Sequence, residues 1–450
     1  MHYLNSTITV FKKATLFLFF TFSYLLSTAQ ENSPYTRYGI GDVVPAQNIA
    51  SRGMGGIATG YVDGNAAFQS INLNNPASLP YINRTIYDLG ADISVRTLKS
   101  NTSPAKYKAT NTNIAYLQLA FPLTTDRMRK KSISWVMAMG LKPLTRINYK
   151  IEAASRSIGI DSLNTLYEGS GGVSQANFST GIRIKNFSFG ATTGYSFGNR
   201  NISTQKRFIN DSISVYKFSN TESSTRFGAV FLNLGAQYMI ALNKKTSLRI
   251  GATANLQQSL KATRNEINET IQYDGNGTPF SIDTVSFNKE QAGFVKLPAT
   301  YSVGFTINND NWVIGADLDL ANWSTYRFYG TKDPLQNSLK LRVGAQYFPA
   351  NENTPASKKL LFVKYRAGFY YGNDYVNLNS NRPDYGITLG AGIPLTSTLL
   401  YRRGEFVSLN TGIEMGQKGN KSNLSVREGV FRISIGLSMS ATWFQKRKYD

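Results

Sequence analysis

The sequence predicts an all-β protein, a transmembrane antiparallel β-barrel of about 14 strands with an N-terminal hatch, or plug segment, inside its lumen. Three observations predict this fold. The chain begins like an exported protein, a glycine-rich stretch follows, and large apolar residues then alternate with small polar ones through most of residues 86–444. Apolar and polar residues also alternate along the strands of a soluble β-sandwich, but those strands are usually only about 5 to 6 residues long. The pattern therefore favours a barrel in a membrane.

The first 29 residues have the layout of a cleaved signal peptide. Lys12 and Lys13 precede an apolar run at residues 14–26, and small residues follow before Gln30. The run is shorter than the roughly 20 residues that a spanning helix needs. We therefore expect removal of residues 1–29 and export of the mature chain to the cell outer membrane.

The residue composition argues against an enzyme. The chain has no cysteine, and its one histidine, His2, lies in the predicted signal peptide. The mature chain therefore offers no thiolate nucleophile, no imidazole base and no histidine ligand for a metal. We expect no catalytic residues, no cofactor and no metal site.

The charge is strongly basic, at +22 for the whole chain and +20 without Lys12 and Lys13. The basic residues are scattered through turns and strand ends and form no run. This distribution favours contact with an anionic membrane surface, such as outer-membrane lipid or lipopolysaccharide, and we expect no nucleic-acid partner.

Residues 30–85 are predicted to form the hatch, because they match neither a regular helix nor a strand. Irregular backbone at membrane depth is tolerated only inside protein or beside a water-filled cavity. A barrel of fourteen strands is also too wide for its own side chains to fill. Residues 53–58 formally match a G-x-G-x-x-A dinucleotide motif, but no apolar strand precedes them and no acidic residue lies at positions 74–80.

From residue 86 onward the pattern has a period of two. Phe187 and Phe189, for example, flank Ser188, so that one face of the strand is large and apolar while the other is small and polar. The segments reach the length of about ten residues that a tilted strand needs to cross a bilayer. The predicted barrel strands are 86–98, 112–122, 132–147, 173–184, 187–199, 226–242, 246–260, 294–307, 312–325, 338–349, 359–372, 384–395, 404–417 and 428–444.

Short and long connections alternate between these strands. The predicted tight turns are 185–186, 243–245 and 308–311, and the predicted long polar loops are 148–172, 200–224 and 261–293. Barrels of this class have short periplasmic turns and long extracellular loops. We therefore assign the long loops to the cell exterior and residues 445–450 to a short periplasmic tail.

Three groups of residues carry a family resemblance. They are Arg52-Gly53-Met54-Gly55-Gly56 with Asn75-Pro76-Ala77, then residues 297–304 with 311–317 and 322–324, and finally residues 341–347 with 365–370. In this order they resemble the FadL, OmpP1 and TodX family of outer-membrane long-chain fatty-acid transporters. The start at residues 33–39 and the WFQKRKYD end look like versions from the Bacteroidota.

The resemblance implies a plugged barrel that takes up hydrophobic molecules, such as long-chain fatty acids, by passive transport. For the hatch residues Gly53, Gly55, Gly56, Asn75, Pro76 and Ala77 it implies a gating role, with a static plug as the alternative. Asn75 is also suited to cap a short helix or turn. Phe68, Ile71 and Leu73 are candidates to contact an apolar ligand, and Arg52 is a candidate to pair with a carboxylate.

In the family the ligand leaves sideways, through a gap beside a kinked early strand. Pro122 and Pro143 stand at the ends of the second and third predicted strands. They either break strand pairing at such a gap, because proline donates no ladder hydrogen bond, or simply end strands at turns. The second interpretation is the simpler one.

A second function remains open. One branch of the family in the Bacteroidota serves a protein secretion system as an accessory or shuttle protein that binds a protein partner at the outer face. The predicted extracellular loops 200–224 and 261–293 are long enough to supply such a surface. A barrel enzyme such as a phospholipase is a third class, but those relying on histidine are incompatible with this mature chain.

Overall fold

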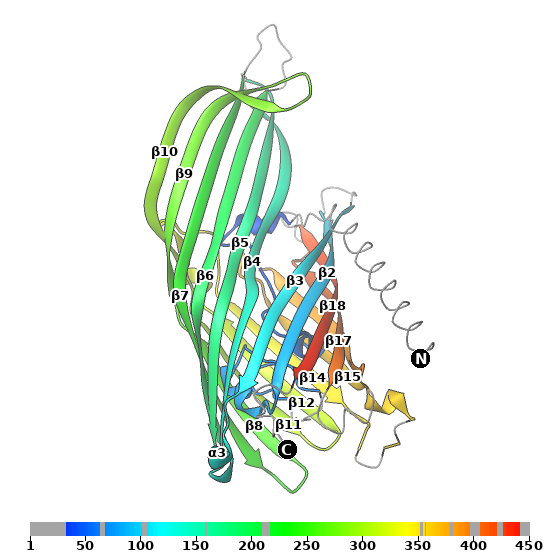
Figure 1. The fold of residues 1–450 in the computed structure, drawn as a ribbon. Coiled ribbons are helices and arrows are strands. Elements are labelled where there is room, and N and C mark those ends of the chain that lie inside the picture. Colours follow the sequence, from blue (N-terminus) through cyan, green and yellow to red (C-terminus); the bar gives the residue numbers. More distant parts are fainter. Residues whose placement is uncertain are drawn as a thin grey trace, which may run out of the picture.

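A computed structural model describes residues 33–63, 68–100, 106–157, 160–208, 217–351, 354–355, 357–378, 381–396, 406–420 and 426–441. The predicted signal peptide, the end of the last predicted strand at residues 442–444 and the predicted tail lie outside these residues. The described chain forms a closed antiparallel β-barrel with a tall sheet rising from one side (Figure 1). We call the end that carries this sheet, at the top of Figure 1, the upper end.

Fourteen strands make the barrel wall, as predicted. They are β2 (Thr85–Lys99), β3 (Lys106–Pro122), β4 (Ile133–Ser157), β5 (Ile160–Ile184), β6 (Phe187–Phe208), β7 (Phe218–Ala241), β8 (Ser247–Asn255), β11 (Thr300–Asn308), β12 (Trp312–Ala321), β14 (Ser338–Tyr347), β15 (Lys364–Asn373), β16 (Pro383–Pro394), β17 (Val407–Lys418) and β18 (Arg427–Ala441). β18 pairs with β2 and closes the ring.

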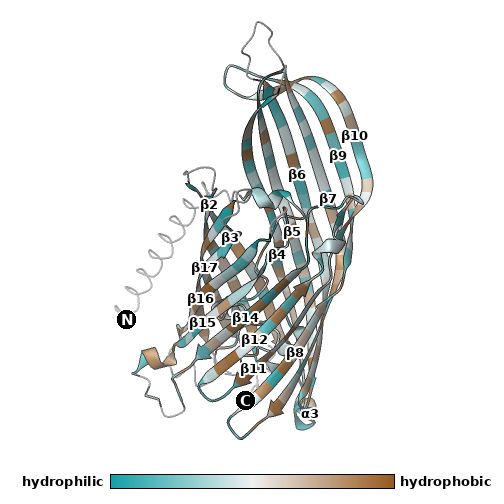
Figure 2. Ribbon diagram, turned by 180° about the vertical axis from the view of Figure 1, so that it is seen from behind, coloured by the Kyte–Doolittle hydropathy of each residue, from teal (hydrophilic) through white to brown (hydrophobic). Residues whose placement is uncertain are grey.

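The alternation of side chains sets which face of each strand meets lipid. Phe187 and Phe189 are 51% and 52% exposed, whereas Ser188 between them is fully buried. Hydrophobic residues recur along the barrel strands in Figure 2. Within the described ranges, no helix is both long enough and apolar enough to cross a membrane.

The prediction of three long polar loops is wrong, because the chain stays in strands there. β4 to β7 continue far beyond the barrel, and β9 (Gln258–Tyr273) and β10 (Pro279–Leu297) fill the third predicted loop. Together they form the upper sheet, in the order β4-β5-β6-β7-β9-β10 (Figure 1). Outside lipid, a strand does not need one large apolar face, so its sequence lacks the alternation that marked the spanning strands.

Four predicted strands are shorter than expected. The strand predicted at 246–260 is divided between β8 and β9, and the strand predicted at 294–307 is divided between β10 and β11. The strand predicted at 312–325 ends at Ala321 and is followed by the 3-10 turn η3 (Trp323–Thr325). The strand predicted at 359–372 begins only after another turn, η4 (Lys359–Phe362). Trp323 and Phe362 are both buried, so these turns fold apolar residues into clusters where the sequence pattern suggested continued strand. Of the remaining elements, α3 (Asp126–Lys130) connects β3 to β4, and β13 (Arg327–Phe328) follows η3.

Residues 33–84, which we call the N-terminal segment, contain η1 (Pro34–Arg37), β1 (Asp42–Val43), α2 (Ile49–Arg52) and η2 (Pro76–Tyr81). Ser33 hydrogen-bonds to Glu428 at the upper end of β18. The segment enters β2 at the opposite end, where Thr85 pairs with Ala441. It therefore runs the length of the barrel, and most of its described side chains are buried.

Candidate functional site: the lumen cavity and the N-terminal segment

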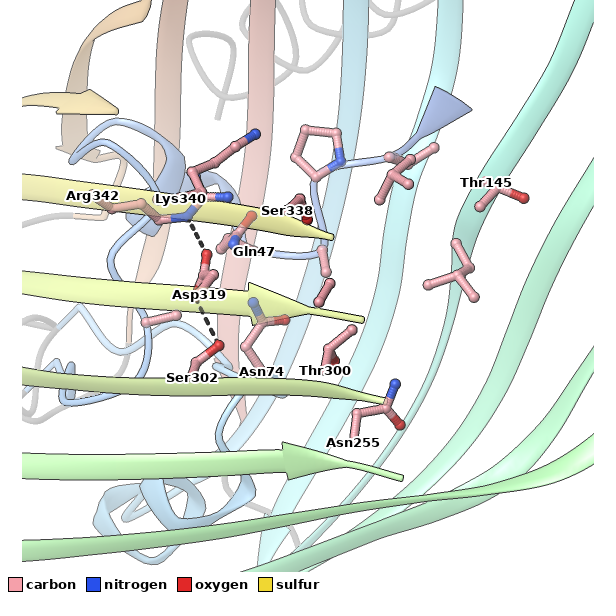
Figure 3. Close-up of a pocket in the computed structure, with 18 of the residues that line it drawn as sticks. Gln47, Asn74, Thr145, Asn255, Thr300, Ser302, Asp319, Ser338, Lys340 and Arg342 are labelled. Atoms are coloured by element: carbon pink, nitrogen blue, oxygen red, sulfur yellow. Dashed lines mark hydrogen bonds and ion pairs between the residues drawn. The ribbon is translucent and has the colours of Figure 1, made fainter. Parts of the chain in front are cut away.

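A cavity of about 360 Å³ lies between the N-terminal segment and the wall. Gln47 and Asn74 line it from the segment, while Thr145 of β4 and Arg342 of β14 line it from the wall (Figure 3). Its apolar lining includes Ile40, Val43, Leu73, Leu144, Phe231 and Leu297. A mixed lining of this kind can hold an apolar molecule and orient a polar group on it.

The charged side chains around the cavity are mostly paired with one another. Arg342 Nε lies 2.6 Å from Asp319 Oδ2, and Asp319 also accepts a hydrogen bond from Ser302 (Figure 3). Such pairing is expected, because an unpaired charge that leaves water is costly. No cluster of three His, Cys, Asp or Glu side chains in the described part of the chain is placed to hold a metal ion.

The wall opens on one side, between β3 and β4. These strands pair only over a short stretch, which begins where Leu117 of β3 pairs with Leu141 of β4 and ends where Pro122 of β3 pairs with Val136 of β4. Above that level β3 pairs with β2 alone and lies apart from β4 (Figure 1). There β4 pairs with β5 and with the short strand β1. We call the unpaired stretch the β3–β4 slot.

Pro143 stands where the slot begins. It lies inside β4, at a register shift between Pro143 and Thr145 in the pairing with β5. The simpler interpretation, that both prolines end strands, is therefore wrong for Pro143 but right for Pro122, the last residue of β3. A proline is tolerated at such a bulge because no ladder hydrogen bond is required of it.

The N-terminal segment covers the inner edge of the slot. Asp42 and Val43 of β1 pair with Arg146 and Thr145 of β4, and the Val44 amide donates to the Leu144 carbonyl at 3.0 Å. Val43, Leu144 and Thr145 also line the cavity. The cavity therefore reaches the wall where two of its strands have separated.

The predicted Asn75-Pro76-Ala77 element packs against a row of glycines. Gly181, Gly190 and Gly235 stand opposite one another on β5, β6 and β7. A Cβ at Gly181 would lie 2.6 Å from the Pro76 carbonyl oxygen, so only glycine leaves room for the backbone of η2.

Asn75 caps η2, as predicted. Its side-chain oxygen accepts a hydrogen bond from the Ala77 amide at 3.0 Å, and its amide group donates to the Thr59 carbonyl at 2.6 Å. Pro76 occupies the first position of η2, where no amide hydrogen is needed. The element is thus held both by the wall and by the rest of the N-terminal segment.

The predicted glycines 53, 55 and 56 lie against the other side of the barrel. A Cβ on Gly53 would come 3.1 Å from Gly390 Cα. Gly55 has a φ of +67°, and its Cβ would lie 2.6 Å from the Val343 carbonyl oxygen. Both the backbone conformation and the close approach therefore require glycine at position 55.

The three apolar residues that were predicted to contact a ligand lie in different places. Leu73 lines the cavity. Phe68 packs edge-on against Phe348, with ring centroids 6.1 Å apart, and Ile71 is fully buried in a cluster with Leu79. Of these three side chains, only Leu73 belongs to the cavity lining.

Arg52 lines the cavity but is already paired. Its Nη1 lies 2.8 Å and 2.6 Å from the two carboxylate oxygens of Asp92 in β2. Its other nitrogens donate to the carbonyls of Gln47 and Pro45. Its guanidinium therefore ties α2 to the wall, and a carboxylate ligand would have to compete with Asp92.

The acidic and basic wall residues that hold the N-terminal segment were not predicted from the sequence. Asp317 Oδ2 accepts hydrogen bonds from the amides of Ala58 and Thr59 at 2.6 and 2.7 Å. Lys364 Nζ lies 2.6 Å from Asp63, with both side chains buried. The sequence did contain a sign of this role, because a charged residue inside a membrane-spanning strand has to face the lumen, where the N-terminal segment lies.

Asp42 connects the upper part of the segment to two wall strands. Arg96 of β2 hydrogen-bonds to it, and Lys418 Nζ of β17 lies 3.0 Å away. Burial on its own would raise the pKa of Asp42, but Arg96 and Lys418 outweigh it and hold the pKa below its ordinary value. Asp42 is therefore held as a carboxylate.

Comparison with solved structures supports the same architecture. The toluene transporter TodX of Pseudomonas putida is 17% identical, with 89% of this chain and 99% of that chain covered and a TM-score of 0.52. A FadL homologue of Pseudomonas aeruginosa is 14% identical, with coverages of 90% and 99% and a TM-score of 0.53. The toluene transporter TbuX of Ralstonia pickettii is 15% identical, with coverages of 87% and 98% and a TM-score of 0.51.

At these identities the likeness concerns the fold, which is the one that the FadL-type resemblance implied. The comparison with curated proteins found no match. Among protein families, the model of the family described as BamG matches residues 10–450, nearly the whole sequence. This chain therefore belongs to the BamG family.

Proposed function

We propose that this protein is an outer-membrane channel for the passive uptake of hydrophobic molecules such as long-chain fatty acids. The observation that carries the proposal is the partly apolar cavity that reaches the β3–β4 slot. The fold is shared with proteins named as toluene transporters. An apolar molecule that enters from the upper end would leave sideways through the slot, where it meets lipid in place of water.

In this proposal the upper part of the N-terminal segment is the gate. β1 adds only two residues to the exposed edge of β4, so that a small displacement would uncover the slot. The Asn75-Pro76-Ala77 element and the glycines at 53, 55 and 56 hold the rest of the segment in place against the wall. Gating therefore falls to residues 40–47, with the lower part acting as a fixed plug.

A disulfide across the gate tests this proposal. Val43 and Thr145 are direct cross-strand partners, and the chain has no cysteine of its own. Antiparallel partners have Cα atoms about 4.5–5.5 Å apart, which suits a disulfide. We expect the oxidised Val43→Cys, Thr145→Cys variant to lose uptake of a fluorescent fatty acid into outer-membrane vesicles, and a reductant to restore it.

The matched control is Val303→Cys, Leu318→Cys, a pair on β11 and β12 in the barrel wall. This disulfide should leave uptake unchanged under both conditions. Uptake that stays at the wild-type rate in the oxidised gate variant would contradict the gate. Uptake no faster than in vesicles that lack the protein would contradict the channel itself.

The upper sheet supports a second candidate, an accessory role in protein secretion that depends on a protein partner. Six strands extend beyond the barrel, and along Pro279–Gln291 β10 pairs with β9 alone among the described strands. Phe280 and Val285 on this edge are 48% and 70% exposed. If this role holds, deleting residues 262–292 should abolish partner co-purification and leave fatty-acid uptake intact.

A further inference from the structure

A second cavity, of about 630 Å³, lies on the upper sheet and shares no lining residue with the lumen cavity. Residues of all six strands of the upper sheet line it, from β4 at one edge to β10 at the other. Because neighbouring strands lie about 4.8 Å apart, the six strands give it a length of roughly 24 Å. We call this cavity the upper groove.

The upper groove lies on the face of the sheet that continues the lipid-facing side of the barrel. Phe197 of β6 is exposed on that side, and the period of two along the strand places Asn201, Ser203 and Gln205 on the same face. Over this length β6 pairs residue for residue with β5 and β7. The groove therefore faces away from the lumen, above the part of the wall that meets lipid.

The lining of the upper groove is polar and carries an excess of carboxylates. Lys150, Glu168, Ser203 and Glu222 stand opposite one another on four successive strands. Lys150 pairs with Glu168 at 2.7 Å, whereas Glu222 makes no hydrogen bond or ion pair with any described residue. With Glu269, three carboxylates and one ammonium group line the groove, which disfavours an anionic ligand.

One buried amide of the upper groove lacks a partner for its oxygen. Asn220 of β7 is 7% exposed, and its Nδ2 donates to Glu269 Oε1 at 2.8 Å. The side-chain oxygen of Asn220 is buried and accepts no hydrogen bond in the described chain. Buried amide oxygens are normally satisfied, so this one indicates that a hydrogen-bond donor belongs in the groove.

A metal ion and an apolar molecule both fit this lining poorly. Throughout the described ranges, no three His, Cys, Asp or Glu side chains converge as a metal site requires. Most side chains of the groove are polar, and an apolar molecule would take water from them without replacing its hydrogen bonds. A hydroxyl group fits, because it both donates and accepts.

We propose that the upper groove binds an oligosaccharide. A sugar ring carries several neighbouring hydroxyls, which would donate to the Asn220 oxygen and the Glu222 carboxylate and accept from the Asn201 side-chain amide. Phe280 of β10, 48% exposed, also lines the groove and would cover the apolar face of a ring. This site does not depend on the proposed channel.

Binding of four fluorescent neutral hexasaccharides tests the proposal. They are built from glucose, galactose, mannose or N-acetylglucosamine, and fluorescence anisotropy reports their binding. The protein is kept in dodecyldimethylamine oxide, a detergent without a sugar head group that would compete. We expect wild type to bind at least one hexasaccharide, and to bind a hexalysine peptide at least about tenfold more weakly.

The variant Ser203→Trp places an indole in the middle of the groove and should weaken saccharide binding at least about tenfold. Thr204→Trp is the matched control, because the side chain of the next residue lies on the opposite face of β6, and it should bind like wild type. Asn220→Ala should weaken binding about fivefold, as the loss of one neutral hydrogen bond would give. The heat-dependent shift of the barrel on gels verifies that each variant is folded.

Three results would overturn the proposal. The first is that wild type binds none of the four hexasaccharides, and the second is that Ser203→Trp and Thr204→Trp bind them equally. The third is that hexalysine alone binds and Glu222→Gln abolishes its binding, which would assign the groove to a cationic peptide. Fatty-acid uptake by Ser203→Trp should equal that of wild type, so the groove and the channel stand or fall separately.

The source of the saccharide follows from one further comparison. The hexasaccharide that binds most tightly is attached to a lipid and displayed on phosphatidylcholine vesicles. If the displayed form competes at least about tenfold better than the free form, the groove recognises a glycolipid of the membrane surface. Equal competition identifies a soluble saccharide.

Discussion

Arg52 and Asp92 form a buried ion pair that joins the N-terminal segment to the barrel wall, with side chains 6% and 5% exposed. One guanidinium nitrogen contacts both carboxylate oxygens. Asp92 also accepts a hydrogen bond from Ser434 of β18 at 2.6 Å, so that the pair lies beside the seam where the ring closes. The Asp92 carboxylate therefore joins the N-terminal segment to the seam between β2 and β18.

Replacing Arg52 with Met should destabilise the protein by about 3–5 kcal/mol, because it leaves the Asp92 carboxylate buried without its cation. The free energy of unfolding can be measured by urea titration of the folded band on unheated gels. Lys150→Met, which breaks the exposed pair with Glu168, should cost at most about 1 kcal/mol. If the two substitutions lower the free energy of unfolding equally, the buried pair of Arg52 and Asp92 stabilises the protein no more than an exposed ion pair does.

Replacing Gly190 with Ala should displace the Asn75-Pro76-Ala77 element. The new methyl group would overlap the backbone of Pro76, and overpacking of this kind typically costs about 1–3 kcal/mol. We expect faster protease cleavage within residues 60–80. Gly275→Ala serves as the control, because no atom lies within 4 Å of the added group, and its cleavage rate should equal that of wild type.

Asp317→Ala should loosen residues 58 and 59 and enlarge the cavity. Two buried amide hydrogens would lose their acceptor, at about 1–3 kcal/mol each. Hydrogen exchange at Ala58 and Thr59 should accelerate. The exposed turn residue Asp310 offers a comparison, since Asp310→Ala removes only a surface pair with Lys245 and should leave that exchange unaffected.

The attachment of β1 should depend on pH only in strong acid. The pKa of Asp42 is below its ordinary value, so its pairing with Arg96 and Lys418 is fully present above about pH 4, the range of a free aspartate. It is lost as the pH falls through the lower pKa of the folded protein. Protease accessibility of residues 40–47 should therefore stay constant from pH 8 to about pH 4 and rise below it.

Asp42→Asn provides the control for that experiment. The amide cannot titrate, so residues 40–47 should be more accessible than in wild type at neutral pH, and the acid-dependent rise should shrink. An unchanged profile in this variant would assign the transition to another group.

The barrel strands were predictable because lipid and lumen act on opposite faces of each strand. Phe187 and Ser188 differ in size and polarity for that reason, and the same alternation along the chain identified the fourteen strands. The upper sheet was not predictable in this way. Its strands meet no lipid, so that residues such as Thr221 and Glu222 look like loop residues although they pair with β9.

The candidate site was only partly predictable. Asn75 and the glycines at 53, 55 and 56 were visible because local backbone geometry demands those residue types. The partners were not visible, because Asp92 and Arg52 are brought together by strand register and not by sequence spacing.

The path of the N-terminal segment determines the order in which the molecule can be assembled. Ser33 contacts Glu428 across 395 positions, and the two halves of the seam lie at opposite ends of the chain. A segment already surrounded by fourteen strands cannot be threaded in afterwards without breaking many buried contacts. The wall therefore has to close around the N-terminal segment, and the seam between β2 and β18 can form only after the last strand has been synthesised.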